Sequence, residues 1–433
     1  MRARLGTTFQ SLTVRNYRLF AAGQAIKLIA IWMQFVAQDW LVLELTDNSA
    51  YALGMVTALQ FTPSLVLTLY GGKLADRHDK RRLLVWTNAV FSALALALGL
   101  LVATGAVNLA WIFVFAGAMG AATAIETPVR QSFVSELVPR ELLPNALSLS
   151  AAVFNSARIV GPALAGVAIA TAGIAPIFLL NAATMLAPAV MLAQMRVADL
   201  HREVHPPSDT RIRDGMRYIW HRDDLILPLA LLFVVGLVGF NYNLTLPVLS
   251  KVVFSTGAGQ FGLLMTALAV GSLGGALAST GRRRRPSAYT LIGAAIGFGA
   301  VSIVSGVLSS YWLTALALMP TGFFMIYFFQ AANQRVQLGT DAAYRGRVMA
   351  MFVLVFMGTT PLGAPAVGAV SEHFGPQASI WGGGVLSLLA GLIALTWQLR
   401  RDGARIGVRL RPLPRLYLRP SETAPAVVGA GHS

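Results

Sequence analysis

Residues 72–84, GKLADRHDKRRLL, place five Lys or Arg residues, two Asp and one His between two long apolar runs, 53–72 and 83–104. A helix needs about 20 mostly apolar residues to cross about 30 Å of hydrocarbon, and both runs meet that length. The charged stretch therefore predicts a polar connection between two membrane-spanning helices. The same alternation of apolar run and polar connection continues in both directions along the chain.

The whole composition agrees with a membrane protein. Of the 433 residues, 56% are hydrophobic and 12% are charged, whereas a soluble domain is about 45–50% apolar and about 25% charged. Twelve apolar runs predict an all-α membrane protein with spans near 19–43, 53–72, 83–104, 109–129, 146–170, 176–195, 225–249, 259–280, 287–308, 312–333, 348–371 and 377–399.

The positive charges indicate which way the chain is inserted. Of the 34 Lys and Arg residues, 31 lie in the N-terminal tail and in every second connection, while the six intervening connections contain only Lys251. Because positively charged loops stay in the cytoplasm, we expect both termini and the connection 196–224 to be cytoplasmic. The same rule accounts for the run 282–285, RRRR, so no nucleic-acid partner is expected. The first span has no early cleavage site, and we expect it to be retained.

Several kinds of chemistry are excluded or unsupported. The chain has no Cys, which removes disulfides, thiolate nucleophiles and Cys-ligated metals. All six His lie outside the spans, so membrane haem ligation is unsupported. No G-x-x-x-x-G-K-[ST] phosphate loop occurs. We expect no cofactor, no metal and no enzymatic activity. The excess of Arg over Lys suggests a bacterial gene and hence the bacterial cytoplasmic membrane.

The chain repeats itself. A shift of 202 residues lays Gly161 on Gly363 and Gly166 on Gly368, and a shift of about 208 lays 53–59 on 261–268. Two matched six-helix bundles that enclose a midplane cavity are common among secondary transporters. We expect an N-terminal bundle (1–195), a cytoplasmic linker with an interfacial helix (196–224), a C-terminal bundle (225–399) and a basic tail (400–433) that is partly disordered and adheres to anionic lipid.

The 72–84 connection resembles the signature loop of the major facilitator superfamily, G-x-L-A-D-R-x-G-R-[RK], except that Asp79 replaces the usual Gly. Further matches join it to the branch that contains the enterobactin exporter and related drug and secondary-metabolite exporters. They are 15–18 (RNYR), 32–34 (WMQ), 38–41 (QDWL), 128–131 (PVRQ), 161–162 (GP), 241–243 (NYN) and 345–349 (RGRVM).

The resemblance implies specific roles. The loop residues Gly72, Asp76, Arg77 and Arg81 are expected to form a conformational switch, in which Asp76 binds the N-terminal end of a neighbouring helix and Arg130 of the fourth span. Residues Gly161, Pro162 and Gly166 resemble the antiporter motif of the fifth span, although the glycine pattern is incomplete. Close helix packing is the alternative explanation for these small residues.

Polar residues form stripes in spans that, by resemblance, line the substrate cavity. Candidate cavity residues are Gln24, Lys27, Gln34 and Gln38 in the first span, Asn241 and Asn243 in the seventh, and Gln330 and Asn333 in the tenth. The first-span residues follow i, i+3, i+4 spacing and so share one helix face. Hydrogen bonding between helices is the alternative for each amide.

Ionisable residues inside spans are functional candidates because each costs at least about 2.5–3.5 kcal/mol at the helix centre. Asp39, Glu126 and Arg158 are candidates for proton coupling. Glu126 has two possible partners, Arg158 and Arg130. Lys27 stands where the resemblance implies a small polar residue, and it either selects substrate or neutralises Glu126.

The resulting hypothesis is a monomeric secondary transporter that exports a small amphipathic molecule, such as a drug, siderophore or secondary metabolite, by proton antiport and alternating access. An importer or uniporter of the same fold and a non-transporting membrane sensor are the alternatives. The sequence does not identify the cargo.

Overall fold

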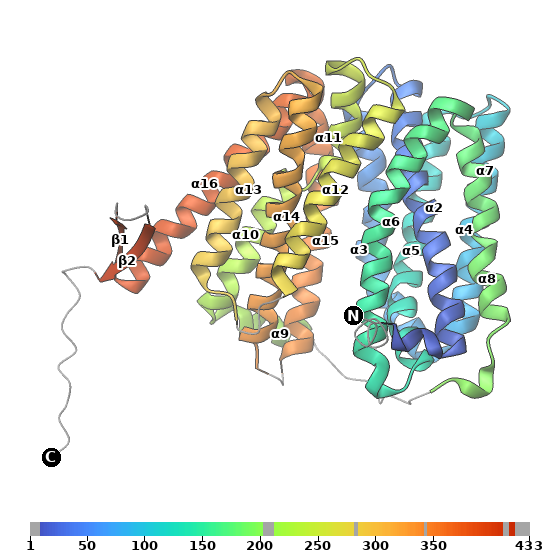
Figure 1. Cartoon of the computed structure of the whole chain (residues 1–433), viewed down its shortest axis with the longest axis horizontal. Helices are drawn as coiled ribbons and strands as arrows, with labels where there is room; N and C mark the ends of the chain where they lie inside the picture. The colour runs from blue at the N-terminus through green and yellow to red at the C-terminus, as the bar shows by residue number, and fades with distance from the viewer. Residues whose placement is uncertain (1–8, 202–211, 281–284, 342–343, 410–414, 421–433) are drawn as a thin grey trace.

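The computed structural model describes residues 9–201, 212–280, 285–341, 344–409 and 415–420. Within these residues, 12 helical segments are long and apolar enough to cross a membrane, which confirms the prediction of twelve spans. Six spans form each of two bundles (Figure 1). The N-terminal bundle contains α2 (Arg15–Leu45), α3 (Ala50–Arg77), α4 (Lys80–Ala103), α5 (Leu109–Leu137), α6 (Leu143–Ala172), α7 (Ala175–Thr184) and α8 (Leu186–Ala193). The C-terminal bundle contains α10 (Asp223–Gly239), α11 (Tyr242–Val248), the π-helix η4 (Leu249–Val253), α12 (Ala258–Thr280), α13 (Ala288–Val307), α14 (Tyr311–Gly339), α15 (Arg345–Phe374) and α16 (Pro376–Asp402).

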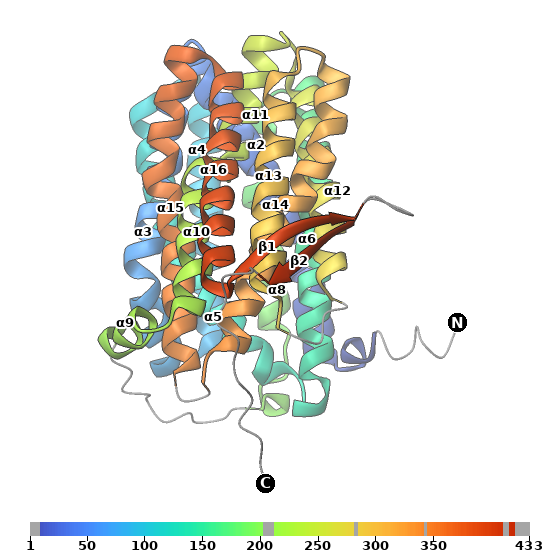
Figure 2. The same cartoon turned by 90° about the vertical axis from the view of Figure 1, so that its left-hand side faces the viewer.

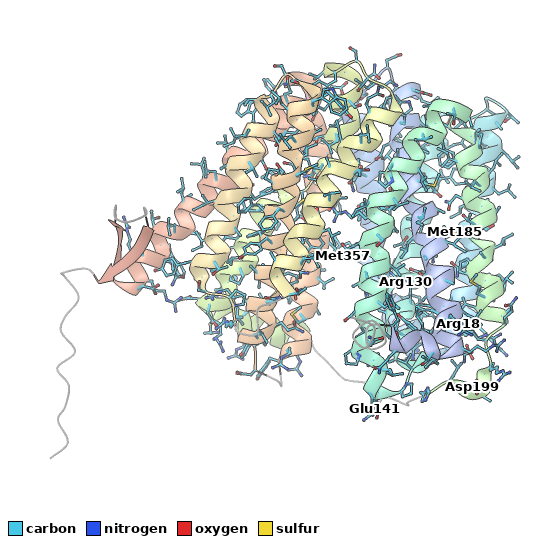
Figure 3. The ribbon with its side chains drawn as sticks, in the orientation of Figure 1. Arg18, Arg130, Glu141, Met185, Asp199 and Met357 are labelled. Carbon is cyan, nitrogen blue, oxygen red and sulfur yellow. The ribbon has the colours of Figure 1, made fainter. Side chains whose placement is uncertain are left out.

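Two spans are interrupted. The sixth span changes from α7 to α8 at Met185, which Figure 3 places about halfway along the N-terminal bundle. The seventh changes from α10 to α11 through Phe240 and Asn241, whose backbone angles are not helical. Non-helical backbone at membrane depth occurs where protein or a water-filled cavity surrounds it. The seventh span therefore brings irregular backbone into the interior of the protein.

The two ends of the bundles are named by the helices that reach them. The face at which α2 begins and α16 ends is the terminal face, and the face at the other end of the spans is the opposite face. Figure 1 shows the two sets of ribbons closest together at the opposite face, at the top of the view. The described hydrogen bonds between the bundles lie at that face or at mid-height, the latter from the Thr266 hydroxyl to the carbonyl of Ile159 at 3.3 Å. The bundles are thus closed together on the opposite face.

Glycines form matching close contacts in the two bundles. A Cβ at Gly161 of α6 would lie 2.4 Å from Trp32 Cβ of α2, and one at Gly363 of α15 would lie 2.0 Å from the carbonyl oxygen of Leu237 of α10. In the repeat, α6 and α15 correspond, and so do α2 and α10. The structure therefore agrees with the internal repeat, and it shows why a side chain does not fit at these two positions.

The same symmetry joins one bundle to the other. A Cβ at Gly166 would lie 2.8 Å from the carbonyl oxygen of Ala258, and its counterpart at Gly368 would lie 2.7 Å from that of Ala50. A Cβ at Gly262 would lie 2.4 Å from the carbonyl oxygen of Pro162. The antiporter-like residues Gly161, Pro162 and Gly166 therefore take part in close helix packing, within the bundle and across to α12.

Shorter elements complete the chain. Helix α9 (Ile212–Trp220) lies at the terminal ends of α10 and α15 (Figure 2), where the sequence predicts a helix. The tail forms a two-stranded antiparallel hairpin of β1 (Ala404–Arg409) and β2 (Arg415–Pro420), with Ala404 opposite Pro420. The sequence analysis did not predict this hairpin. The remaining elements are η1 (Gln10–Thr13), η2 (Arg140–Leu142) and η3 (Val197–Asp199).

Candidate functional site

The centre of the N-terminal bundle contains a buried group of three charges. Lys27 Nζ of α2 donates to Glu126 Oε1 of α5 at 2.7 Å, and Arg130 Nε, one turn further along α5, donates to the same oxygen at 3.0 Å. The Lys27 side chain is 1% exposed, and its ammonium lies 5.0 Å from the centre of the Phe91 ring. Figure 3 shows Arg130 in the terminal half of the bundle. Lys27 thus neutralises Glu126, the second of the two roles that the sequence left open for it.

The remaining polar residues of the first span also turn into the bundle. Gln34 accepts a hydrogen bond from Asn181 of α7, and Gln38 donates to Gln60 of α3 at 3.2 Å. Gln24 lines a small cavity of about 90 Å³ between α2, α5 and α6, and its Oε1 has no hydrogen-bond partner among the described residues. For Gln34 and Gln38 the structure therefore shows the alternative of hydrogen bonds between helices.

A second face of α2 carries aromatic rings and one acid. Trp32, Phe35 and Asp39 follow i, i+3, i+7 spacing, so they share a face. The Trp32 ring contacts the rings of Phe35 and, across on α6, Phe154. The Arg158 guanidinium lies 5.8 Å from the centre of the Trp32 ring. Trp32, Phe35, Asp39 and Arg158 are half-buried, and Phe154 is exposed.

Neither ionisable residue of this surface has a counter-charge in the part of the chain that the structure describes. Among the described residues, Arg158 forms no ion pair and Asp39 forms neither an ion pair nor a side-chain hydrogen bond. Arg158 therefore does not pair with Glu126, which the sequence analysis had considered. A cation held only by an aromatic face keeps its donors available to another group.

The C-terminal bundle offers a matching aromatic surface. Phe240, at the break of the seventh span, makes edge contacts with the rings of Phe298, Phe328 and Phe356. Phe356 in turn packs on Phe329, with ring centres 4.6 Å apart. Both Phe240 and Phe356 are half-buried. The break in the span thus places an aromatic cluster at the middle of the bundle.

The predicted amides of this bundle differ in their surroundings. Asn241 is buried and donates to the carbonyl of Leu237 at 2.9 Å, which satisfies backbone freed by the break. Asn243 is exposed, Gln330 and Asn333 are half-buried, and these three form no side-chain hydrogen bond within the described chain. Asn243, Gln330 and Asn333 remain candidates for contact with a substrate.

The 72–84 loop contacts the sixth span through Arg81. Its Nε donates to the carbonyl of Leu192 at 2.6 Å and its Nη2 to that of Ala193 at 2.8 Å, so it caps the C-terminal end of α8. Arg77 is exposed at the end of α3, and a Cβ at Gly72 would meet no neighbour. The side chain of Asp76 lies outside the described residues, so its predicted contact with Arg130 stays a prediction.

Two charged contacts were missed in the sequence analysis. At the terminal face, Asp224 accepts from Arg222 at 2.8 Å and from Arg285 at 2.7 Å, and this bonding holds the pKa of Arg222 above its usual range. At the opposite face, Glu372 of α15 binds the first backbone N–H groups of α3. The adjacent acids in 222–224, RDD, were an available signal for the first contact. No local pattern marks the second.

Comparison with known proteins gives one family over nearly the whole chain. The family described as transmembrane secretion effector matches residues 6–414. The chain is 28% identical to the staphyloferrin A transporter of Staphylococcus aureus, in an alignment covering 59% of this chain and 64% of that protein. It is 26% identical to the multidrug efflux pump Tap of Mycolicibacterium fortuitum, over 83% and 90% of the two chains.

A macrolide efflux protein of Streptococcus pyogenes is 24% identical over 79% of this chain and 86% of its own. Among solved structures, a bacterial homologue of the human lysosomal transporter Spinster, inward-facing and occupied, superposes with a TM-score of 0.71 at 14% identity, covering 89% and 97% of the two chains. The nucleoside transporter NupG superposes with a TM-score of 0.66 at 12% identity, covering 88% and 99%. These structures share the fold.

Proposed function

Because the chain belongs to the major facilitator superfamily, in the family described as transmembrane secretion effector, we propose that this transporter exports a small amphipathic molecule in exchange for protons. The curated relatives include proteins named for multidrug and macrolide efflux and for a siderophore. These names support export and a cargo that combines apolar surface with oxygen-rich groups.

Asp39 carries the proton-coupling part of this proposal. Glu126 is bound by two cations, so protonating it would leave Lys27 and Arg130 without their shared counter-charge. Uncompensated charge in a buried site is strongly unfavourable. Asp39 has no cation and no hydrogen-bond donor among its described neighbours, so a proton can join or leave it without breaking an ion pair. Of the two acids, we assign coupling to Asp39.

The substrate surface combines the two aromatic clusters. On the N-terminal side, Trp32, Phe154 and Arg158 offer flat apolar contact and a guanidinium. On the C-terminal side, Phe240 and Phe356 supply more aromatic area. Arg binds planar carboxylates and similar oxygen-rich groups through paired donors. The cargo we propose is therefore an aromatic or macrocyclic molecule that carries carboxylate, catecholate or carbonyl oxygens.

The closed opposite face corresponds to one stage of transport. With the terminal face in the cytoplasm, as the positive charges predict, the structure is closed to the outside. Export then requires that cargo bound from the cytoplasm triggers opening of the opposite face. Asp39, which lies in the third of α2 nearest that face, would exchange its proton after this opening, and its protonation state would bias the return.

Everted membrane vesicles provide the test. After a proton gradient is set up, a macrolide, a lipophilic dye and a carboxylate siderophore are added in turn. Dissipation of the pH gradient is followed with a fluorescent probe. For the native chain, we expect the cargo to dissipate the gradient. Asp39→Asn should abolish gradient-driven uptake and retain cargo exchange between the two sides, since exchange needs no net proton movement.

Asp47→Asn is the matched control, because Asp47 is exposed just beyond the end of the same helix and forms no side-chain hydrogen bond or ion pair within the described chain. It should transport like the native chain. Gradient-driven uptake that survives in Asp39→Asn would refute the assignment of Asp39.

A second experiment tests the direction of transport. Inward flux in oriented proteoliposomes would show an importer, and cargo binding without any flux would show a sensor. Either result would overturn the proposal of export.

A further inference from the structure

A basic cavity lies between the interfacial helix and the C-terminal bundle, away from the proposed substrate surface. Its volume is about 520 Å³, and it lies between α9, the turn that follows it and the start of α15. The residues that line it are Arg217, Tyr218, His221, Arg222, Tyr344 and Arg347. Three guanidiniums and one imidazole that line a single cavity favour the binding of an anion.

Two of these cations have no counter-charge among the described residues. Arg217 and Arg347 form no ion pair and no side-chain hydrogen bond within the described chain, and the Nε of Arg347 is buried without any partner. Arg222, by contrast, is bound to Asp224. A buried donor without a partner costs about 1–3 kcal/mol. An anion in the cavity would remove that cost.

Two of the three guanidiniums lie against stacked rings. The rings of Tyr218 and Tyr344 stack with centres 4.4 Å apart, which joins α9 to α15. Arg222 lies 5.5 Å from the centre of the first ring and Arg347 lies 5.6 Å from that of the second. A guanidinium held on an aromatic face loses less freedom when it binds a phosphate. The cavity is therefore organised before a ligand arrives.

The neighbouring side chains place the cavity at the depth of lipid headgroups. Trp220 and Met216 of α9 are 77% and 50% exposed, and the seventh span begins three residues after Trp220, at Asp223. An amphipathic helix with exposed Trp and apolar residues beside Arg lies in the membrane interface. The anion that is concentrated at this depth is the phosphate of an acidic phospholipid.

We propose that this cavity binds the phosphate of an anionic phospholipid headgroup, with Arg217 and Arg347 as its principal contacts. The bound lipid connects α9 to the start of α15, and so attaches the linker between the bundles to the C-terminal bundle. This site is independent of the transported molecule.

Native mass spectrometry of the full-length chain tests the proposal. Phosphatidylglycerol and phosphatidylcholine with identical acyl chains are added to detergent-solubilised protein, and the apparent Kd of the first lipid bound is measured for each. The native chain should prefer phosphatidylglycerol. The double variant R217Q/R347Q should bind it about 10- to 30-fold more weakly, because each basic contact near the surface contributes about 1 kcal/mol.

The matched control is R15Q/R18Q, which removes two exposed arginines from the terminal face of the other bundle. Its affinity should stay within about 2-fold of native, since charges beyond a Debye length of about 8–10 Å are largely screened. Should the double variant fail to fold, R217Q alone, at an exposed position, should bind phosphatidylglycerol about 5-fold more weakly.

Equal losses of affinity in the test and control variants, or no loss in either, would overturn the site. Displacement of phosphatidylglycerol by millimolar inorganic phosphate would show a site for a free anion and would overturn the assignment to lipid.

Discussion

Glu372 of α15 accepts a hydrogen bond of 2.6 Å from the backbone N–H of Ala50, the first residue of α3 in the other bundle. A second bond of 3.2 Å comes from the N–H of Tyr51 to the same oxygen. One carboxylate therefore caps a helix that belongs to the opposite half of the molecule, where the partial positive charge of the helix N-terminus favours an anion.

Glu372→Gln should weaken closure of the opposite face. Loss of the charge removes about 0.3–1 kcal/mol, and up to ~2 kcal/mol in a partly buried geometry, from the closed state. The closed population should fall relative to the open one by about 2- to 30-fold. Spin labels at Thr104→Cys and Ser309→Cys, which lie at the opposite face in different bundles, report the change as longer distances in double electron–electron resonance. The chain has no native Cys to remove.

Asp47→Asn is the control for this experiment as well, because it removes an exposed carboxylate from the same face that has no side-chain partner within the described chain. Its distance distribution should match that of the native protein. Indistinguishable distributions for Glu372→Gln and Asp47→Asn would show that the contact does not hold the bundles together.

Removing one member of the buried ion pair should be more damaging than removing both. Glu126→Gln leaves Lys27 as an uncompensated buried charge, so we expect a loss of about 3–5 kcal/mol in stability. The double variant Lys27→Met/Glu126→Met should recover part of that loss, because apolar replacements of a buried pair are often neutral, while the 24% exposed Arg130 still loses its partner. Thermal unfolding in detergent measures both. A double variant that is less stable than Glu126→Gln would contradict this account.

Arg81 should stabilise the C-terminal end of α8, the second half of the sixth span. Arg81→Gln removes charged hydrogen bonds to two carbonyls, each bond contributing about 1.5–3 kcal/mol, so amides near the end of α8 should exchange hydrogen at least about tenfold faster. Hydrogen–deuterium exchange with mass spectrometry of residues 186–196 reads this out. Arg82→Gln, at the adjacent exposed position, is the control and should exchange like the native chain. Equal exchange in the two variants would remove the capping role.

The matched glycines should be equally intolerant of a methyl group. Gly161→Ala and Gly363→Ala each force a Cβ to within 2.4 Å or less of a neighbouring helix, and overpacking of this kind costs about 1–3 kcal/mol. Gly293→Ala is the control, because a Cβ there meets nothing within 4 Å and Ala favours a helix interior by about 1 kcal/mol. The melting temperature should fall for the first two and hold or rise for the third. A stable Gly161→Ala beside an unstable Gly363→Ala would contradict the equivalence of the two contacts.

The sequence predicted what depends on composition and local order. Twelve spans follow from the lengths of the apolar runs, two bundles from the internal repeat, and a helix before the seventh span from basic and aromatic residues at helical spacing. The pairing of Gln34 with Asn181 joins residues far apart in the chain, and no local pattern distinguishes it from a contact with substrate. Glu372 lies near the end of a span and reads as an ordinary polar residue.

One missed element did leave a signal. Residues 405–409, RIGVR, and 415–419, RLYLR, alternate basic and apolar residues with a period of two, which is typical of a strand. Their high Arg content favoured an interpretation as a lipid-binding tail, and the alternation was overlooked. By contrast, the break at Phe240 and Asn241 depends on how the span packs against its neighbours, and the polar residues beside it, Asn241 and Asn243, were interpreted as cavity residues.

That break divides the seventh span into a long rod, α10, and a short cap formed by α11 and η4. The cap carries Lys251, whose ammonium lies 5.1 Å from the centre of the Trp40 ring on α2. The cap also packs on α12, α15 and α16 of its own bundle, so tilting of the C-terminal bundle would carry Lys251 away from Trp40. Under the proposed export mechanism, the contact between Lys251 and Trp40 would therefore have to break before cargo could leave on that side.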